Sequence, residues 1–293
     1  MRIICLSLCL MFVLTGCAQE TYHFATVNGE ELHLDVYTPE VEAEKYPVLI
    51  WMHGGGFAVG SRDNDPDVRF MKAAQEQGYL AVSVSYRLLR KDKETGFGCD
   101  CPSSEKEHVF REAAKDFWKG VQYVYDHAEE WNIDTNSIIV GGSSAGAEGV
   151  MNAIYLKDWV YEDHASAEFK SVDAIPIAGV LSLAGAVVDQ RYITSDSAIP
   201  GLFYHGVKDQ LVPYATAPHH YCSPDRLGYI WLDGAYSVHE KLQAFGASSI
   251  LVSYPDARHE ISGVPFDELD ELFHWMDQLF IKKANIHATY EKK

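Results

Sequence analysis

The chain has 293 residues, of which 47% are hydrophobic and 23% charged, and its formal net charge is −18. This length suits one large domain with a substantial core, and the composition excludes intrinsic disorder. The negative charge argues against a nucleic-acid partner, because binding to nucleic acid depends on Lys and Arg side chains that neutralise phosphates.

Residues 1–16 are predicted to be a signal peptide, with a positive start followed by an apolar run too short to span a bilayer. Residues 14–17, Leu-Thr-Gly-Cys, resemble a bacterial lipobox. That resemblance implies cleavage before Cys17, a lipid-anchored N-terminus and a mature domain over residues 17–293. Ala18, in place of Asp, favours the outer membrane by resemblance to enterobacterial sorting, with the periplasmic or surface face left open. The alternative is an ordinary secretory signal with an incidental cysteine.

The rest of the chain predicts alternating strands and helices. Residues 22–37 alternate around Asn28-Gly29, which is typical of a type I′ hairpin. Apolar runs predict buried strands at 48–52, 80–86, 138–142, 177–187, 201–205 and 249–254. Helical spacing and caps predict helices at 65–78, 104–128, 147–156, 236–245 and 266–280, the first capped by Asp65-Pro66 and the second by a capping box of Ser104 with Glu107. An α/β fold follows, with a mostly parallel sheet, an N-terminal antiparallel hairpin and helices on both faces.

The spacing of these elements leaves no room for a large cap. No linker divides the chain, and only residues 284–293 are expected to lie outside the domain at its C-terminal end. About a dozen residues separate Asp189 from Gly201, too few for a lid, so we expect an open site. The longest irregular stretch, residues 212–233, is expected to form one wall. Its aromatic residues are predicted either to form a ligand platform or to pack the loop onto the body: Tyr221, Tyr229 and Trp231.

The most informative motif is Gly142-Ser143-Ser144-Ala145-Gly146, which follows an apolar strand and precedes a helix. A Gly-x-Ser-x-Gly sequence in this context predicts a nucleophile elbow, whose tight turn accepts only small flanking residues. Ser144, at the centre, is the predicted nucleophile.

A serine nucleophile needs an imidazole to take its proton and a carboxylate to orient that imidazole. Asp209 lies in a turn after the predicted strand 201–205, and His259 follows the predicted strand 249–254. Their order along the chain, Ser then Asp then His, is the order found in folds that carry a nucleophile elbow. Asp256 is the rival acid, and the rival bases, His219 and His220, follow the acid turn instead of the last strand.

His53-Gly54-Gly55-Gly56-Phe57 ends the predicted strand 48–52. Backbone amides of glycines approach a developing oxyanion closely, so Gly55 and Gly56, together with Ala145, are the predicted oxyanion-hole donors. His53 is expected to brace this loop.

Together these motifs resemble the α/β-hydrolase superfamily, specifically the HGGG-type esterases related to hormone-sensitive lipase and the carboxylesterases. Tyr86-Arg87-Leu88 resembles the YRL sequence of that group, and the resemblance covers about residues 22–282. The lidless build and lipobox look like exported feruloyl- or acetyl-xylan-esterase-like proteins. Ala147 after the elbow departs from the common GxSAGG form.

The sequence therefore predicts a serine carboxylic ester hydrolase that forms an acyl-enzyme and needs no cofactor. Its partner is expected to be a small-molecule or carbohydrate ester, either short-chain or an acetyl or feruloyl ester of a polysaccharide. The alternatives are a serine exopeptidase and a catalytically silent hydrolase-fold binding protein.

Cys99, Cys101 and Cys222 follow the predicted signal peptide and Cys17. Cys99-Asp100-Cys101 has no second cysteine pair, so we expect no zinc site. An exported compartment permits disulfides, and Cys222 is predicted to pair with Cys99 or Cys101, since both loops emerge at the same edge of a parallel sheet. Three free thiols are the alternative.

Overall fold

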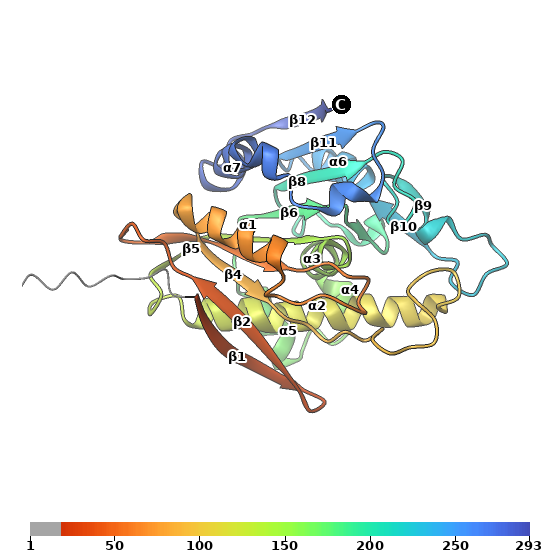
Figure 1. Ribbon diagram of the computed structural model, residues 1–293, viewed down its shortest axis with the longest axis horizontal. Helices are drawn as coiled ribbons and strands as arrows, with labels where there is room; N and C mark the ends of the chain where they lie inside the picture. Colours follow the sequence, from red (N-terminus) through yellow and green to blue (C-terminus); the bar gives the residue numbers. More distant parts are fainter. Residues whose placement is uncertain (1–18) are drawn as a thin grey trace, which may run out of the picture.

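A computed structural model describes residues 19–293, so the predicted signal peptide and Cys17 lie outside the described residues. The centre of the molecule is a nine-stranded sheet with the order β1-β2-β4-β3-β5-β6-β8-β11-β12 (Figure 1). These strands are β1 (Gln19–Val27), β2 (Glu30–Tyr37), β3 (Tyr46–Met52), β4 (Leu80–Val84), β5 (Ile133–Ser143), β6 (Gly179–Leu183), β8 (Gly201–Gly206), β11 (Ser249–Tyr254) and β12 (His287–Glu291).

The predicted hairpin forms the antiparallel edge of this sheet. β1 pairs with β2, and β2 pairs antiparallel with β4. Asn28 and Gly29 have φ angles of 53° and 85°, the left-handed values that a type I′ turn requires at both central positions. From β4 to β12 every neighbouring pair is parallel, so the predicted α/β fold class is confirmed.

Helices cover both faces of the sheet. α1 and α7 pack on one face through apolar residues such as Phe70 and Phe273. α2, α3 and α6 cover the other face, where Phe117, Val150 and Val238 join its core. The helices are α1 (Asp65–Glu76), α2 (Ser103–Asp126), α3 (Ala145–Tyr155), α4 (Lys157–Val160), α5 (Ala167–Asp173), α6 (Ala235–Ala244) and α7 (Leu269–Met276), the last continued by a π-helical turn at Asp277–Ile281.

The caps predicted for two helices were wrong, although α1 begins at the predicted residue. The side chain of Asn64, not Asp65, accepts the hydrogen bond from the backbone of Asp67 that caps α1. α2 begins at Ser103 after Pro102, with no side-chain cap, so the predicted capping box does not form. The short helices α4 and α5 were also not predicted, because the polar segment around them lacks a long apolar repeat.

The predicted strand over residues 177–187 is in fact two strands. β6 ends at Leu183, and β7 (Ala186–Val187) belongs to a separate three-stranded antiparallel sheet. That sheet has the order β7-β10-β9 and includes β9 (Thr216–Pro218) and β10 (Trp231–Gly234).

The C-terminal segment also differs from the expectation. Residues 287–291 form β12, which pairs in parallel with β11, so residues 284–293 are part of the domain. Their alternation of polar and apolar residues is that of an edge strand, which a search for continuous apolar runs does not find.

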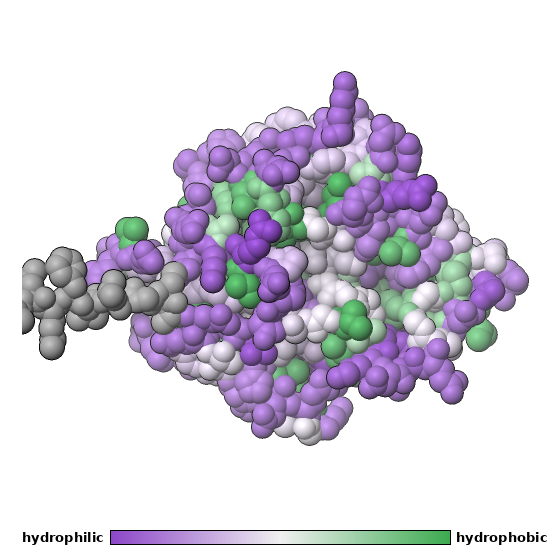
Figure 2. All heavy atoms as spheres, in the orientation of Figure 1, coloured by the Kyte–Doolittle hydropathy of each residue, from purple (hydrophilic) through white to green (hydrophobic). Residues whose placement is uncertain are grey.

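The molecular surface seen in the orientation of Figure 1 is mostly hydrophilic, with apolar residues in small separate patches (Figure 2). Within residues 19–293, no helix combines the length and the apolar composition needed to cross a bilayer.

Candidate active site

The predicted site residues gather at the carboxyl edge of the parallel strands. Ser144 directly follows β5, Asp209 follows β8, His259 follows β11, and the glycines at 54–56 follow β3. This is the edge at which open α/β sheets bind ligands. A cavity of about 660 Å³ lies there, and Ser144 and His259 both line it.

The elbow at Ser144 has the tight geometry that its sequence predicts. Ser144 has φ 49° and ψ −122°, a strained conformation for a residue with a side chain. A Cβ atom on Gly146 would lie 2.1 Å from the carbonyl oxygen of Met52, and one on Gly142 would lie 2.5 Å from the carbonyl carbon of Gly146. Only glycines at these two positions let the strand, the turn and the helix approach so closely.

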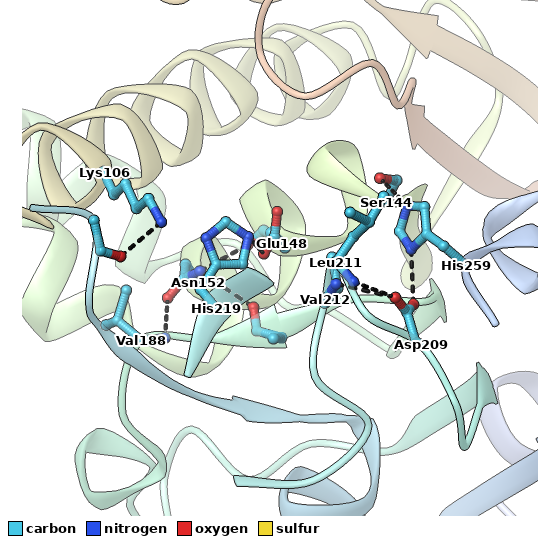
Figure 3. Close-up of polar contacts among 12 residues, drawn as sticks. Lys106, Ser144, Glu148, Asn152, Val188, Asp209, Leu211, Val212, His219 and His259 are labelled. Carbon is cyan, nitrogen blue, oxygen red and sulfur yellow. Dashed lines mark hydrogen bonds and ion pairs between the residues drawn. The ribbon is translucent and has the colours of Figure 1, made fainter. Parts of the chain in front are cut away.

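The three residues predicted to form a triad are hydrogen-bonded in a row (Figure 3). His259 Nε2 lies 2.8 Å from Ser144 Oγ. On the other side of the ring, Nδ1 lies 2.7 Å from Oδ2 of Asp209. With Nδ1 bonded to the carboxylate, Nε2 is the nitrogen that faces the serine hydroxyl, which is the arrangement a general base requires.

Asp209 is built to carry a negative charge although it is buried. Its Oδ1 accepts hydrogen bonds from the backbone amides of Leu211 (2.8 Å) and Val212 (3.1 Å). Burial alone raises the pKa of Asp209, but hydrogen bonds from His205 and His259 and their charges outweigh it and hold that pKa below its usual range. The carboxylate therefore stays ionised beside the imidazole.

The rival acid does not reach the site. Asp256 is exposed, and its carboxylate pairs with Lys208 at 2.6 Å. His219 and His220 line the cavity, but His259 is the histidine hydrogen-bonded to Ser144.

The predicted oxyanion donors line the same cavity as Ser144. Gly55 has φ +123°, and a Cβ there would lie 2.0 Å from the carbonyl oxygen of Val59, so glycine is required. Within residues 19–293, no protein acceptor bonds the amides of Gly55 and Gly56. Ala145 is the first residue of α3, where a helix leaves its amide without an intrahelical partner. All three amides are therefore available to an acceptor in the cavity.

The glycine loop is held in place by buried contacts of His53, Tyr86 and Arg87. His53 Nδ1 lies 2.7 Å from the carbonyl oxygen of Gly54, and the His53 ring stacks on Tyr86, whose hydroxyl donates to the His53 carbonyl at 3.0 Å. Burial lowers the pKa of His53, which keeps the ring neutral. The next residue, Arg87, is held by Asp116 through bonds of 2.7 and 2.8 Å. The Tyr86-Arg87 pair thus links the loop to α2.

Comparison with known families agrees with this geometry. Residues 34–190, which include the glycine loop and the elbow, match the model of the BD-FAE family. The chain belongs to the BD-FAE family. The match ends before Asp209 and His259, so their assignment in this BD-FAE protein rests on the sequence motifs and the hydrogen bonds.

Curated relatives that match part of the chain include esterases. Gut esterase 1 of Caenorhabditis elegans is 34% identical over 130 residues, which is 43% of this chain and 21% of that protein. Carboxylesterase NlhH of Mycobacterium tuberculosis is 30% identical over 116 residues, 40% of this chain and 31% of that protein. The matches thus span between a fifth and a third of the length of these relatives.

Solved structures share the fold over nearly the whole chain. A thermophilic esterase of Thermogutta terrifontis with butyrate bound superposes with a TM-score of 0.65 and 14% identity, covering 92% of this BD-FAE chain and 95% of that one. At this identity the likeness establishes the α/β-hydrolase fold.

The cavity of this BD-FAE protein has a second polar wall, which the sequence motifs do not predict. Glu148 lies one turn beyond Ser144 on α3, and His219 Nε2 lies 3.5 Å from its Oε1. Figure 3 shows these two side chains with Lys106, beside the row of Ser144, His259 and Asp209. Glu148 reads in sequence as an ordinary helix residue, and its spacing of four from Ser144 is the one signal that places it on the same face.

The predicted wall at residues 212–233 supplies Val212, His219 and His220 to the cavity lining. The three aromatic residues predicted as a possible ligand platform do not line this cavity. Tyr221 and Trp231 are about half exposed, and Trp231 Nε1 donates a hydrogen bond to Tyr229 Oη at 2.7 Å.

A disulfide joins Cys99 to Cys222, one of the two pairings predicted. Cys101 is a buried free thiol. The bridge ties the loop that carries Phe97 to the loop that carries His219 and His220, and the backbone amide of Gly228 donates to the Cys99 carbonyl at 2.9 Å. One side of the cavity is therefore covalently fastened.

Proposed function

We propose that this protein is a serine carboxylic ester hydrolase. The observation that carries the proposal is the row Ser144–His259–Asp209, with contacts of 2.8 and 2.7 Å, at the mouth of a cavity whose rim carries free backbone amides. Membership of the BD-FAE family and the partial matches to esterases support it.

In the proposed reaction, Ser144 Oγ attacks the ester carbonyl while His259 Nε2 accepts its proton, and Asp209 stabilises the resulting imidazolium. The amides of Gly55, Gly56 and Ala145 donate to the oxyanion of the tetrahedral intermediate. His259 then passes its proton to the leaving alkoxide, the carbonyl–oxygen bond breaks, and an acyl-serine remains. Water then attacks the acyl carbonyl while His259 Nε2 accepts a proton from it. His259 returns this proton to Ser144 Oγ as the acyl–oxygen bond breaks, which releases the carboxylic acid.

We propose short-chain or polysaccharide-linked acetyl and feruloyl esters as substrates. The cavity of about 660 Å³ and the short connection between β7 and β8, which supplies none of the described cavity lining, support small or open-ended substrates over long acyl chains. Hydrolysis of p-nitrophenyl acetate, butyrate and palmitate tests this choice, and a clear preference for palmitate contradicts it.

We also propose that the protein is an exported lipoprotein anchored through Cys17 to the outer membrane. The Cys99–Cys222 disulfide supports export, since such bonds persist in oxidising compartments. Cys17→Ser is expected to release the protein from membranes or to leave its signal unprocessed. Carbonate-resistant membrane binding by that variant, unchanged from wild type, contradicts the proposal.

Labelling with a fluorophosphonate tests the activity itself. The reagent should modify Ser144, identified by peptide mass spectrometry, and Ser144→Ala should lose both labelling and a factor of about 10⁴–10⁶ in ester turnover. Ser171→Ala, an exposed serine on α5, is the matched control. Absent labelling of a folded wild-type protein favours a silent binding protein, and cleavage of peptides without cleavage of esters favours an exopeptidase.

A further inference from the structure

The cavity contains a second histidine–carboxylate pair that the proposed reaction does not use. Glu148 and His219 are 2% and 1% exposed, and both line the cavity. Glu148 lies about one helical turn, or roughly 5.4 Å of axial rise, beyond Ser144, and its backbone amide donates to the Ser144 carbonyl at 2.9 Å. Any substrate group that enters this side must therefore lie close to the scissile carbonyl.

Each member of this pair has a polar atom without a protein partner. Within residues 19–293, Glu148 Oε1 and His219 Nδ1 form no hydrogen bond, although the Glu148 oxygen lies 3.5 Å from His219 Nε2. A buried polar atom left unpaired costs about 1–3 kcal/mol, so such atoms usually serve water or a ligand. Two of them on one cavity wall make a built polar subsite.

The surroundings of Glu148 and His219 favour the uncharged form of both side chains. Burial raises the pKa of Glu148 well above its usual value, Asp209 adds to this rise, and Lys106 offsets only part of it. Burial lowers the pKa of His219 well below its usual value, with His220 and Lys106 acting in the same direction. A protonated carboxyl and a neutral imidazole each offer one donor and one acceptor.

The other charged group nearby is already engaged. Lys106 is fully buried, and its Nζ donates to the carbonyl oxygen of Gly228 at 2.8 Å. The remaining lining on this side includes apolar side chains of Phe97, Leu211 and Val212. A small neutral group that both donates and accepts matches this wall, and a hydroxyl is the simplest such group.

We propose that Glu148 and His219 form a specificity subsite that binds a free hydroxyl group carried by the ester a few bonds from the scissile carbonyl. The hydroxyl belongs either to the alcohol part, as in a partly acylated sugar, or to the acyl part. This inference rests on the proposed esterase function and names its substrate class.

The test compares esters in which one methyl group replaces the hydroxyl. The alcohol-side pair is 2-hydroxyethyl acetate and propyl acetate, and the acyl-side pair is methyl 3-hydroxypropanoate and methyl butanoate. Acid release is followed by pH-stat, and each kcat/KM is divided by the rate constant for hydrolysis by hydroxide. Wild type should prefer the hydroxylated ester at least tenfold in one pair, which identifies the source of the hydroxyl. A preference below threefold in both pairs overturns the proposal.

Variants assign the preference to the two side chains. Glu148→Leu should bring the ratio of the preferred pair below threefold, and Glu148→Gln, which keeps a donor and an acceptor, should retain a higher ratio than Leu. His219→Phe, which replaces an imidazole packed edge-on against Phe97 and Phe110, should lower the ratio as well. The controls are Glu107→Gln and His108→Gln on the exposed face of α2. A wild-type ratio in Glu148→Leu overturns the proposal.

The outcome separates this inference from the proposed function. If wild type hydrolyses propyl acetate and methyl butanoate but shows no preference, the esterase stands and the subsite fails. If it hydrolyses none of the four esters and resists the fluorophosphonate, the proposed function fails. The ratio measured on wild type decides the proposal even if a variant does not fold.

Discussion

Two histidine–carboxylate pairs share one cavity, and they differ in how the carboxylate is treated. Asp209 accepts two backbone amides and lies 2.7 Å from His259, whereas Glu148 leaves an oxygen unpaired 3.5 Å from His219. Both carboxyl groups are buried, yet the pKa of Asp209 lies below its usual range and that of Glu148 far above. The comparison shows that hydrogen bonds to the ionised form, and not burial alone, decide which buried carboxyl carries charge.

The sharpest way to break the comparison is Asp209→Asn. The amide preserves the size of the side chain but removes the charge that stabilises the imidazolium and sets the tautomer of His259. We expect kcat for p-nitrophenyl acetate to fall by about 10⁴ with little change in KM. Steady-state kinetics measures this, and a loss below about tenfold would show that Asp209 does not play the acid's part.

Removing the Cys99–Cys222 disulfide tests whether the cavity wall formed by Glu148 and His219 needs this bridge to keep its shape. Replacing Cys99 and Cys222 together by serine should lower the free energy of unfolding by about 2–4 kcal/mol. Because the bridge joins the loops carrying Phe97 and His219, KM should rise more than kcat falls. Urea unfolding and steady-state kinetics, with and without dithiothreitol, measure both effects. Reductant should leave the double variant unaffected, and an equal effect on it would show that the bridge is not the cause.

A smaller effect concerns pH and stability at Glu148. Its raised pKa means that the folded state holds a proton that the unfolded state releases above about pH 4.3, so this group destabilises the fold as pH rises beyond that value. Glu148→Gln should therefore gain stability relative to wild type as pH increases from 4 to 8. Asp209→Asn should behave differently: its stability deficit relative to wild type should stay nearly constant from pH 5 to 8 and shrink as pH falls below about 3.9, because the depressed pKa of Asp209 gives stability that is lost on acidification.

Urea unfolding at several pH values separates the two variants. If the stability difference between Glu148→Gln and wild type stays constant from pH 4 to pH 8, Glu148 is ionised in the folded state and the contrast with Asp209 disappears.

The smallest effect is expected at the rival acid. Asp256 is exposed and pairs with Lys208 on the surface, where ion pairs contribute little. Asp256→Asn should leave kcat/KM within twofold of wild type. A loss comparable to that of Asp209→Asn would reassign the acid.

The sequence predicted best where a backbone constraint leaves a strict motif. The elbow around Ser144 and the glycine loop at 54–56 are fixed by close approaches that only glycine permits, so residue type alone located them. Asp209 and His259 were located by their place after two strands, and the structure brings both to Ser144.

Features set by distant packing were harder to predict. The sequence offers no reason to prefer Cys99 or Cys101, and the fold decides between them because Cys101 is buried as a free thiol while Cys99 bonds to Cys222. Glu148 becomes special only through burial against His219, which lies 71 positions further along the chain. The polar strand β12 depends on an open edge of β11 and carries no strong signal of its own.

The order of the site along the chain has a consequence for the time at which activity appears during synthesis. Ser144 and the glycine loop emerge from the ribosome well before His259, which follows the nucleophile by 115 residues. The strand that precedes the base, β11, is flanked on one side by β12, which emerges later still. Domains fold as units once their parts are available. A growing chain thus holds its nucleophile without a base, and we expect it to remain inactive until His259 and the strands beside it have emerged and folded.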